Sequence, residues 1–452
     1  MFKYLHLSLI FSALTISFSN AHGALPDLAL SLEEPSWSFL IDNQSSQATE
    51  LTDDERRYLR DLQPALQQAD YDAAERSLNQ RSSSDESAAF SLLRGQILLT
   101  NGKNQQAIIH LKKAVESHPD FAASQRSLGL AYLRTENSKL ARQHLQKAIE
   151  LGDQSAQLYG QLAYLNLREG MASSAISGYQ QALFLDADNE EWARGLLYAL
   201  TRAEALPQAQ ALAEQLLEKQ SSSKELWMLR SQIALRQNKP LQALSSLESA
   251  ISLGEEKAEN LIIAAQLHLN HGSVERSVEL LTSGKILNPS MTEQQQQAII
   301  QTAAWLAQQQ QWDQLQTLLR ASRNRGIPAK ADASLSISKA RMAIETGNHS
   351  GAEKALKSAL RNDPTLGDAL ITLADLLRDQ KRYQQAIMYY QRAEVLPDLQ
   401  ERALLGRAQA HIELSEYDEA LRLLGQVVRK NPTRQDLHAS MRSLRNMTRN
   451  RR

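Results

Sequence analysis

Apolar and polar residues alternate along this chain with the period of an α-helix, in short stretches separated by turn-forming residues. From Thr52 onward, nearly every stretch places its apolar residues three or four positions apart. That spacing is typical of a helix with one buried face. The pattern therefore predicts an all-α protein built from short amphipathic helices.

The helical stretches recur with a period of 34 residues. One alanine position carries the series Ala107, Ala141, Ala175, Ala209 and Ala243, and resumes with Ala352, Ala386 and Ala420. Ser277 and Leu315 fill the gap at spacings of 34, 38 and 37 residues, and Ala74 lies 33 residues before the first member. Small residues recur seven positions later, with large ones between at Leu111, Leu145, Tyr179, Leu247, Leu356 and Tyr390.

Turn residues divide each unit into two helices. They precede the second helix as Gly102, Gly170, Asn238, Gly272 and Gly347, and prolines follow it at Pro119, Pro289, Pro364 and Pro432. Proline cannot continue a helical hydrogen-bond ladder, so it ends the second helix. A single helix pair cannot bury its own apolar face, which means that the units must stack.

The 34-residue pattern resembles the tetratricopeptide repeat. Leu128-Gly129-Leu130-Ala131-Tyr132, followed by Ala141, Leu145 and Ala148, matches the repeat closely, as does the run from Gly347 to Pro364. About ten units from residue 88 to 432 fit, and a degenerate one lies around 54–80. The resemblance implies an α-solenoid, a right-handed superhelix of ten to eleven helix–turn–helix units, whose first helices line a concave face.

Departures from the period suggest the organisation of the chain. We expect a signal peptide at 1–21, an extended leader at 22–51, and a first repeat array at 52–289. A Gln-rich irregular repeat at 290–332 is a possible hinge, although slightly longer loops explain it equally well. A second array at 333–432 and a capping helix with a basic tail at 433–452 complete the chain.

The N-terminal segment indicates export. Lys3 precedes the uncharged run from Tyr4 to Phe18, and Ser19-Asn20-Ala21 offers small residues for cleavage. The run has about 15 residues, fewer than the roughly 20 that span a bilayer. We expect a cleaved secretory signal, a periplasmic protein, and no integral membrane span after cleavage.

Composition and motifs argue against several functions. Lys and Arg total 50 against 51 Asp and Glu, and Cys is absent, so there is no basic excess for nucleic acid and no thiol chemistry. No Walker loop, nucleophile elbow or HExxH motif occurs. His268 with His271, and Asp186 with Asp188, are better explained as surface and helix-capping residues than as metal ligands. We therefore expect no enzyme activity, no metal and no cofactor.

One register position suggests a binding surface. Seven residues before each aligned position the chain has first Thr100, then Arg134, Arg168, Arg202 and Arg236, then Asn270 and Gln308, and finally Glu345, Asp379 and Glu413. Tyr164 and Tyr198 each lie one helical turn before an arginine. Arginine and tyrosine anchor many interfaces. We predict a partner-binding groove at Arg134, Tyr164, Arg168, Tyr198, Arg202 and Arg236, although solvated arginines are common in this register.

Three functions fit these features. The first is a non-catalytic periplasmic scaffold that holds acidic segments of envelope proteins or peptides in its groove, as part of a multi-protein machine. The second is a protein that binds glycan or peptidoglycan through the tyrosines and arginines. The third is a structural spacer, for example in polysaccharide export.

Overall fold

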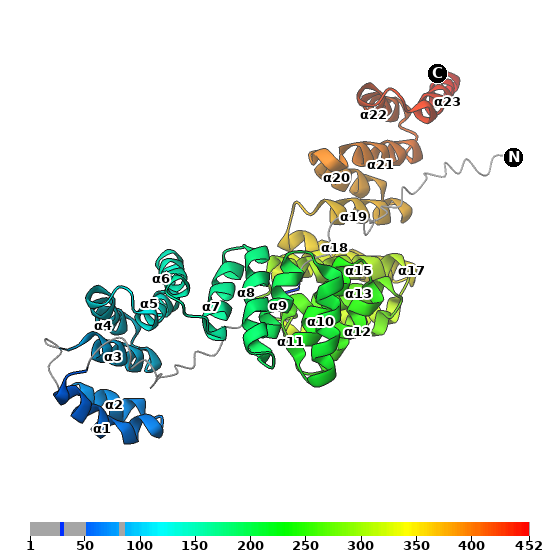
Figure 1. Cartoon of the computed structure of the whole chain (residues 1–452). Helices are drawn as coiled ribbons and strands as arrows, with labels where there is room; N and C mark the ends of the chain where they lie inside the picture. The colour runs from blue at the N-terminus through cyan, green and yellow to red at the C-terminus, as the bar shows by residue number, and fades with distance from the viewer. Residues whose placement is uncertain (1–27, 31–50, 81–85, 452) are drawn as a thin grey trace. The chain divides into compact units, whose positions relative to one another are not determined.

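The computed structural model describes residues 28–30, 51–80 and 86–451. Within these ranges the chain forms α-helices, one short 3-10 helix and no strand, which confirms the predicted fold class. Figure 1 follows the helices along the chain. The predicted signal peptide, and the leader apart from residues 28–30 and 51, lie outside the described residues.

The chain divides into two compact units, Leu30–Ser246 and Leu247–Arg452 with Met1–Ala29. The first unit contains α1 (Asp53–Gln67), α2 (Tyr71–Leu78), α3 (Ala88–Thr100), α4 (Asn104–Ser117), α5 (Ala122–Arg134), α6 (Ser138–Glu150), α7 (Ala156–Arg168), α8 (Ala172–Leu185), α9 (Glu190–Arg202), α10 (Leu206–Lys219) and α11 (Lys224–Arg236). The division falls inside α12 (Pro240–Ser252).

The second unit continues the helix pairs. It contains α13 (Ala258–Asn270), α14 (Val274–Leu281), α15 (Glu293–Gln308), α16 (Trp312–Arg325), α17 (Ala329–Glu345), α18 (His349–Asn362), α19 (Gly367–Asp379), α20 (Tyr383–Glu394), the 3-10 helix η1 (Pro397–Leu399), α21 (Gln400–Glu413), α22 (Tyr417–Lys430) and α23 (Gln435–Arg451). Within each unit, helices of a pair pack against each other and against the next pair, as α7 does with α8 and α8 with α9, or α19 with α20 and α20 with α21.

The turn inside each helix pair has one residue in the left-handed conformation. Glycine supplies it at Gly102, Gly170, Gly272 and Gly347, as the sequence predicted, because glycine adopts positive φ without steric cost. Residues with side chains take the same conformation in the remaining pairs, at Ala69, Glu136, Glu204, Asn238, Gln310, Lys381 and Ser415. The turn is therefore imposed by packing of the two helices rather than by glycine alone.

Stacking of successive pairs depends on close backbone approach. The aligned alanines, from Ala74 to Ala420, are 0% exposed. In two places a tyrosine replaces the usual leucine between them: Tyr179 and Tyr390. A Cβ added at Gly195 would lie 2.4 Å from the Tyr179 ring, and one at Gly406 would lie 2.4 Å from the Tyr390 ring. Each large ring thus depends on a glycine in the following helix pair.

The irregular segment at 290–332 follows a shortened helix and contains a break between α16 and α17. Helix α14 has 8 residues, whereas the second helices around it have 13 or 14, and the chain runs without α-helix from Thr282 to Thr292. Further on, Gly326 ends α16 in the left-handed conformation, and Pro328 precedes α17. The whole segment lies inside the second compact unit. The hinge there stays a prediction.

The C-terminal helix α23 covers the last apolar face. Leu437, Met441 and Leu444 are buried and join a cluster that includes Leu423 and Val427 of α22. A terminal helix of this kind protects the open end of a stacked array.

We expect Gly195→Ala to lower the free energy of unfolding by about 1–2 kcal/mol, because the methyl group overpacks against Tyr179 by more than the added helix propensity offsets. Urea unfolding followed by circular dichroism measures the change. The loss should disappear in a Tyr179→Leu background, which frees the space. Gly425→Ala is the matched control, because its Cβ would meet only Met441 Cε at 3.9 Å. Equal losses in both backgrounds would contradict the packing argument.

Candidate functional site

The four arginines of the predicted groove occupy one structural position. Arg134, Arg168, Arg202 and Arg236 are the last residues of α5, α7, α9 and α11, all in the first compact unit. The C-terminus of a helix carries partial negative charge, so a cation there is favourable by about 0.3–1 kcal/mol. Helix electrostatics therefore supplies one structural reason for the recurrence.

Two of the four arginines contact a neighbouring helix pair. Arg134 Nη1 donates a 2.5 Å hydrogen bond to the carbonyl oxygen of Leu99, near the end of α3. Arg236 Nη1 lies 3.7 Å from Glu204 Oε1, with its side chain 24% exposed. Both residues are half-buried. These contacts link neighbouring helix pairs and reduce what either guanidinium offers to a partner.

Arg168 and Arg202 are exposed. The Arg168 guanidinium carbon lies 5.8 Å from the ring centroid of Tyr164, which is a cation–π distance. Tyr164 is only 4% exposed and Tyr198 is half-buried. The Tyr164 ring therefore contacts Arg168 and is almost completely hidden from solvent. The accessible part of the predicted site centres on two arginines.

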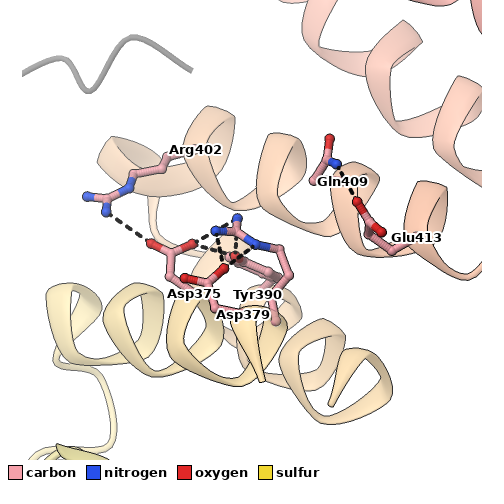
Figure 2. Close-up of polar contacts among 7 residues, drawn as sticks. Asp375, Asp379, Tyr390, Arg402, Gln409 and Glu413 are labelled. Atoms are coloured by element: carbon pink, nitrogen blue, oxygen red, sulfur yellow. Dashed lines mark hydrogen bonds and ion pairs between the residues drawn. The ribbon is translucent and has the colours of Figure 1, made fainter. Parts of the chain in front are cut away.

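Three acids take the same position in the second compact unit. Glu345, Asp379 and Glu413 are the exposed last residues of α17, α19 and α21. An acid at a helix C-terminus is disfavoured by the helix dipole. Donors of the same helix compensate two of them: Arg378 Nη2 lies 3.0 Å from Asp379 Oδ1, and Gln409 Nε2 donates to Glu413 Oε1 at 3.1 Å (Figure 2).

The residues around Asp379 form a polar network that the sequence analysis missed. The Tyr390 hydroxyl donates to Asp375 Oδ1, Arg378 Nη1 donates to the same hydroxyl at 3.1 Å, and Arg402 of α21 reaches Asp375 Oδ2 at 3.3 Å (Figure 2). Burial and the nearby Asp375 charge raise the pKa of Tyr390, so its hydroxyl stays protonated and remains a donor. The only sequence signal is that Asp375 lies one helical turn before Asp379.

Residues considered as metal ligands have other contacts. His268 Nε2 lies 2.6 Å from Glu248 Oε1, and Arg276 also binds that carboxylate at 2.8 Å. Asp186 accepts a hydrogen bond from Asn189, the residue that caps α9. Across the described residues, no three or more His, Cys, Asp or Glu side chains are grouped to hold a metal ion. The described helices also include none with the length and apolar character to cross a membrane.

Tyr390→Phe should lower the free energy of unfolding by about 1–2 kcal/mol, because Asp375 and Arg378 each lose a hydrogen-bond partner in a half-buried site. Chemical denaturation measures the loss. Tyr389→Phe is the control, since Tyr389 is adjacent and its ring packs beside Arg392 at 5.6 Å. If the network does not stabilise the fold, Tyr390→Phe and Tyr389→Phe will both have the free energy of unfolding of the unmodified protein.

Tetratricopeptide repeat models match residues 64–119, 92–156, 199–258, 337–403 and 377–444, which together make up more than half of the chain. A comparison with curated proteins found no match. Similar solved structures include PilF of Pseudomonas aeruginosa (16% identity, 45% of this chain and 92% of that one, TM-score 0.38). A tetratricopeptide repeat protein from Parabacteroides merdae is also similar (13% identity, 50% of this chain and 90% of that one, TM-score 0.39). So is the C-terminal part of a tetratricopeptide repeat protein from Cytophaga hutchinsonii (13% identity, 62% of this chain and 98% of that one, TM-score 0.41). The stacked helix pairs, the 34-residue register and the matched family models agree: the chain belongs to the tetratricopeptide repeat family.

Proposed function

We propose that the protein is an exported, non-catalytic scaffold that binds acidic segments of envelope proteins. The fold supports the general role, because stacked helix pairs present extended surfaces suited to protein–protein interaction. The N-terminal sequence supports export, since Lys3, the uncharged run to Phe18 and Ser19-Asn20-Ala21 form the pattern of a secretory signal.

The exposure of Arg168 and Arg202 is the observation that carries the binding proposal. Their helices, α7 and α9, belong to successive helix pairs of one compact unit. Neighbouring packed helices lie about 8–10 Å apart, close to the Debye length of about 8–10 Å at physiological salt. Two such cations reinforce each other toward an acidic segment, and Tyr164 holds one of them in place.

The glycan-binding alternative has less support. Stacking on a sugar needs an open ring face, and Tyr164 is 4% exposed. A spacer needs only the stacked pairs, so it predicts that surface charge is dispensable. The binding experiment below separates the three functions.

Arg168→Glu/Arg202→Glu should abolish capture of envelope proteins that the unmodified protein retains from an extract at low salt. Reversal of two exposed charges turns attraction of an acidic segment into repulsion. Pull-down with mass spectrometry identifies the proteins that are lost, and circular dichroism verifies that the variant stays helical.

Arg320→Glu/Arg323→Glu is the matched control, because it makes the same charge change on exposed residues of α16. Loss in both variants would indicate non-specific electrostatics, and retention in both would reject the groove. Capture that survives protease treatment of the extract but not muramidase would favour the glycan-binding protein.

Export makes a separate prediction. Cell fractionation should place the protein in the periplasm. Mass spectrometry should show that the mature chain begins at His22. Ala21→Arg should block cleavage, because the peptidase requires a small residue before the cut. An intact Met1 on a cytoplasmic protein would overturn this part of the proposal without affecting the groove.

A further inference from the structure

The helix pair that begins with α13 differs from the three pairs before it at two positions that face the same short segment. In α7, α9 and α11 the residue before the helix is Ser155, Asn189 or Ser223, and each side chain accepts a hydrogen bond from the helix N-terminus. The corresponding residue before α13, 34 positions after Ser223, is Lys257, which makes no such bond. A lysine also places positive charge at the positive end of the helix dipole.

The third residue of the same helices shows the second departure. It is Leu158, Trp192 and Leu226 in α7, α9 and α11, all at most 3% exposed. In α13 it is Asn260, a polar side chain that is 0% exposed. An amide at a core position requires hydrogen-bond partners, because burying it without them is costly.

Both departures are explained by Ala29 of the N-terminal leader. The backbone N–H of Ala29 donates to Asn260 Oδ1 at 2.9 Å, and Lys257 Nζ donates to the backbone carbonyl of Ala29 at 2.9 Å. Leu28, the residue before it, is 5% exposed. The two contacts lie within one compact unit. The lysine and the asparagine thus bind both polar groups of one peptide residue.

A buried carboxylate fixes the orientation of Asn260. Glu255, 5% exposed, accepts from Asn260 Nδ2 at 2.9 Å and from the Lys257 backbone N–H at 3.0 Å. A carboxylate only accepts hydrogen bonds, so the amide NH₂ must face Glu255 and the amide oxygen must face the leader. The site therefore requires a residue with a free backbone N–H and rejects proline.

We propose that Lys257 and Asn260 form a peptide-binding site whose resident ligand is the chain's own Leu28–Ala29. The leader competes with partner segments for this site. A partner segment binds when the leader dissociates, and it needs the same chemistry: an aliphatic residue followed by a small residue with a free backbone N–H. This site is separate from the arginines of α7 and α9, so either proposal can fail alone.

The covalent link sets how strongly the leader competes. A tethered segment has an effective concentration of about a millimolar. If the same segment, as a free peptide, binds the site with a Kd of about 10 μM, the tethered leader lowers the apparent affinity of a competing peptide about 100-fold. Displacing the leader should restore that affinity. The Ala29→Pro substitution does so without deleting any residue, since it removes the N–H that Asn260 accepts.

The test uses a fluorescein-labelled peptide with the sequence of residues 24–33 and the purified protein, with binding measured by anisotropy. We expect Ala29→Pro protein to bind the peptide at least tenfold more tightly than the unmodified protein. Adding Asn260→Leu, which restores the apolar residue of the three preceding units, should abolish that gain, whereas adding Asn270→Ala on the exposed end of α13 should leave it intact. A peptide with proline at the Ala29 position should not bind. Equal binding to the unmodified and Ala29→Pro proteins, or a gain that survives Asn260→Leu, overturns the proposal.

Hydrogen–deuterium exchange gives a second readout that needs no added peptide. Lys257→Ser restores the capping residue of the preceding units and removes the bond to the Ala29 carbonyl. We expect backbone exchange around Leu28 and Ala29 to become at least tenfold faster in Lys257→Ser and in Asn260→Leu, with no change in Asn270→Ala. Unchanged exchange in both site variants would show that the leader does not depend on these side chains.

Discussion

Close approach of helix backbones, permitted by alanine and glycine at fixed register positions, holds each helix pair against its neighbours. The aligned alanines are fully buried, and large side chains fill the space that they leave. The apolar face of one pair is covered only by the next, so the stability of each unit depends on local contacts. The turn conformation follows from the same packing, because residues such as Glu136 and Lys381 adopt a left-handed φ that their side chains disfavour.

The placement of charge at the helix ends follows from this architecture. Every first helix ends at the same register position, so one sequence offset determines the residue that meets the negative end of each helix dipole. Arg134 uses its place to bind the Leu99 carbonyl of the preceding pair, whereas Arg168 and Arg202 extend into solvent. The same position therefore serves the fold in one pair and is available to partners in the next.

Much of the fold could be predicted from the sequence, because periodicity reports which face of a helix is buried. The 34-residue series predicted the helix pairs, the glycine turns and the fold class. The Arg134 bond to Leu99 and the contact of Arg378 with Tyr390 could not be predicted, since side-chain direction and local packing decide them. Lys257 and Asn260 differ in the sequence from the corresponding residues of the three preceding units, but only the structure shows that both contact Ala29.

The pairing of Tyr179 with Gly195, and of Tyr390 with Gly406, bears on how such arrays evolve. Each tyrosine lies in one helix pair and its glycine lies in the next, so duplication or exchange of a single 34-residue unit by recombination would separate them. A tyrosine moved next to a unit without glycine at the facing position would clash with the side chain there. The repeats share one register, but at these two junctions the two neighbouring units have to be kept together.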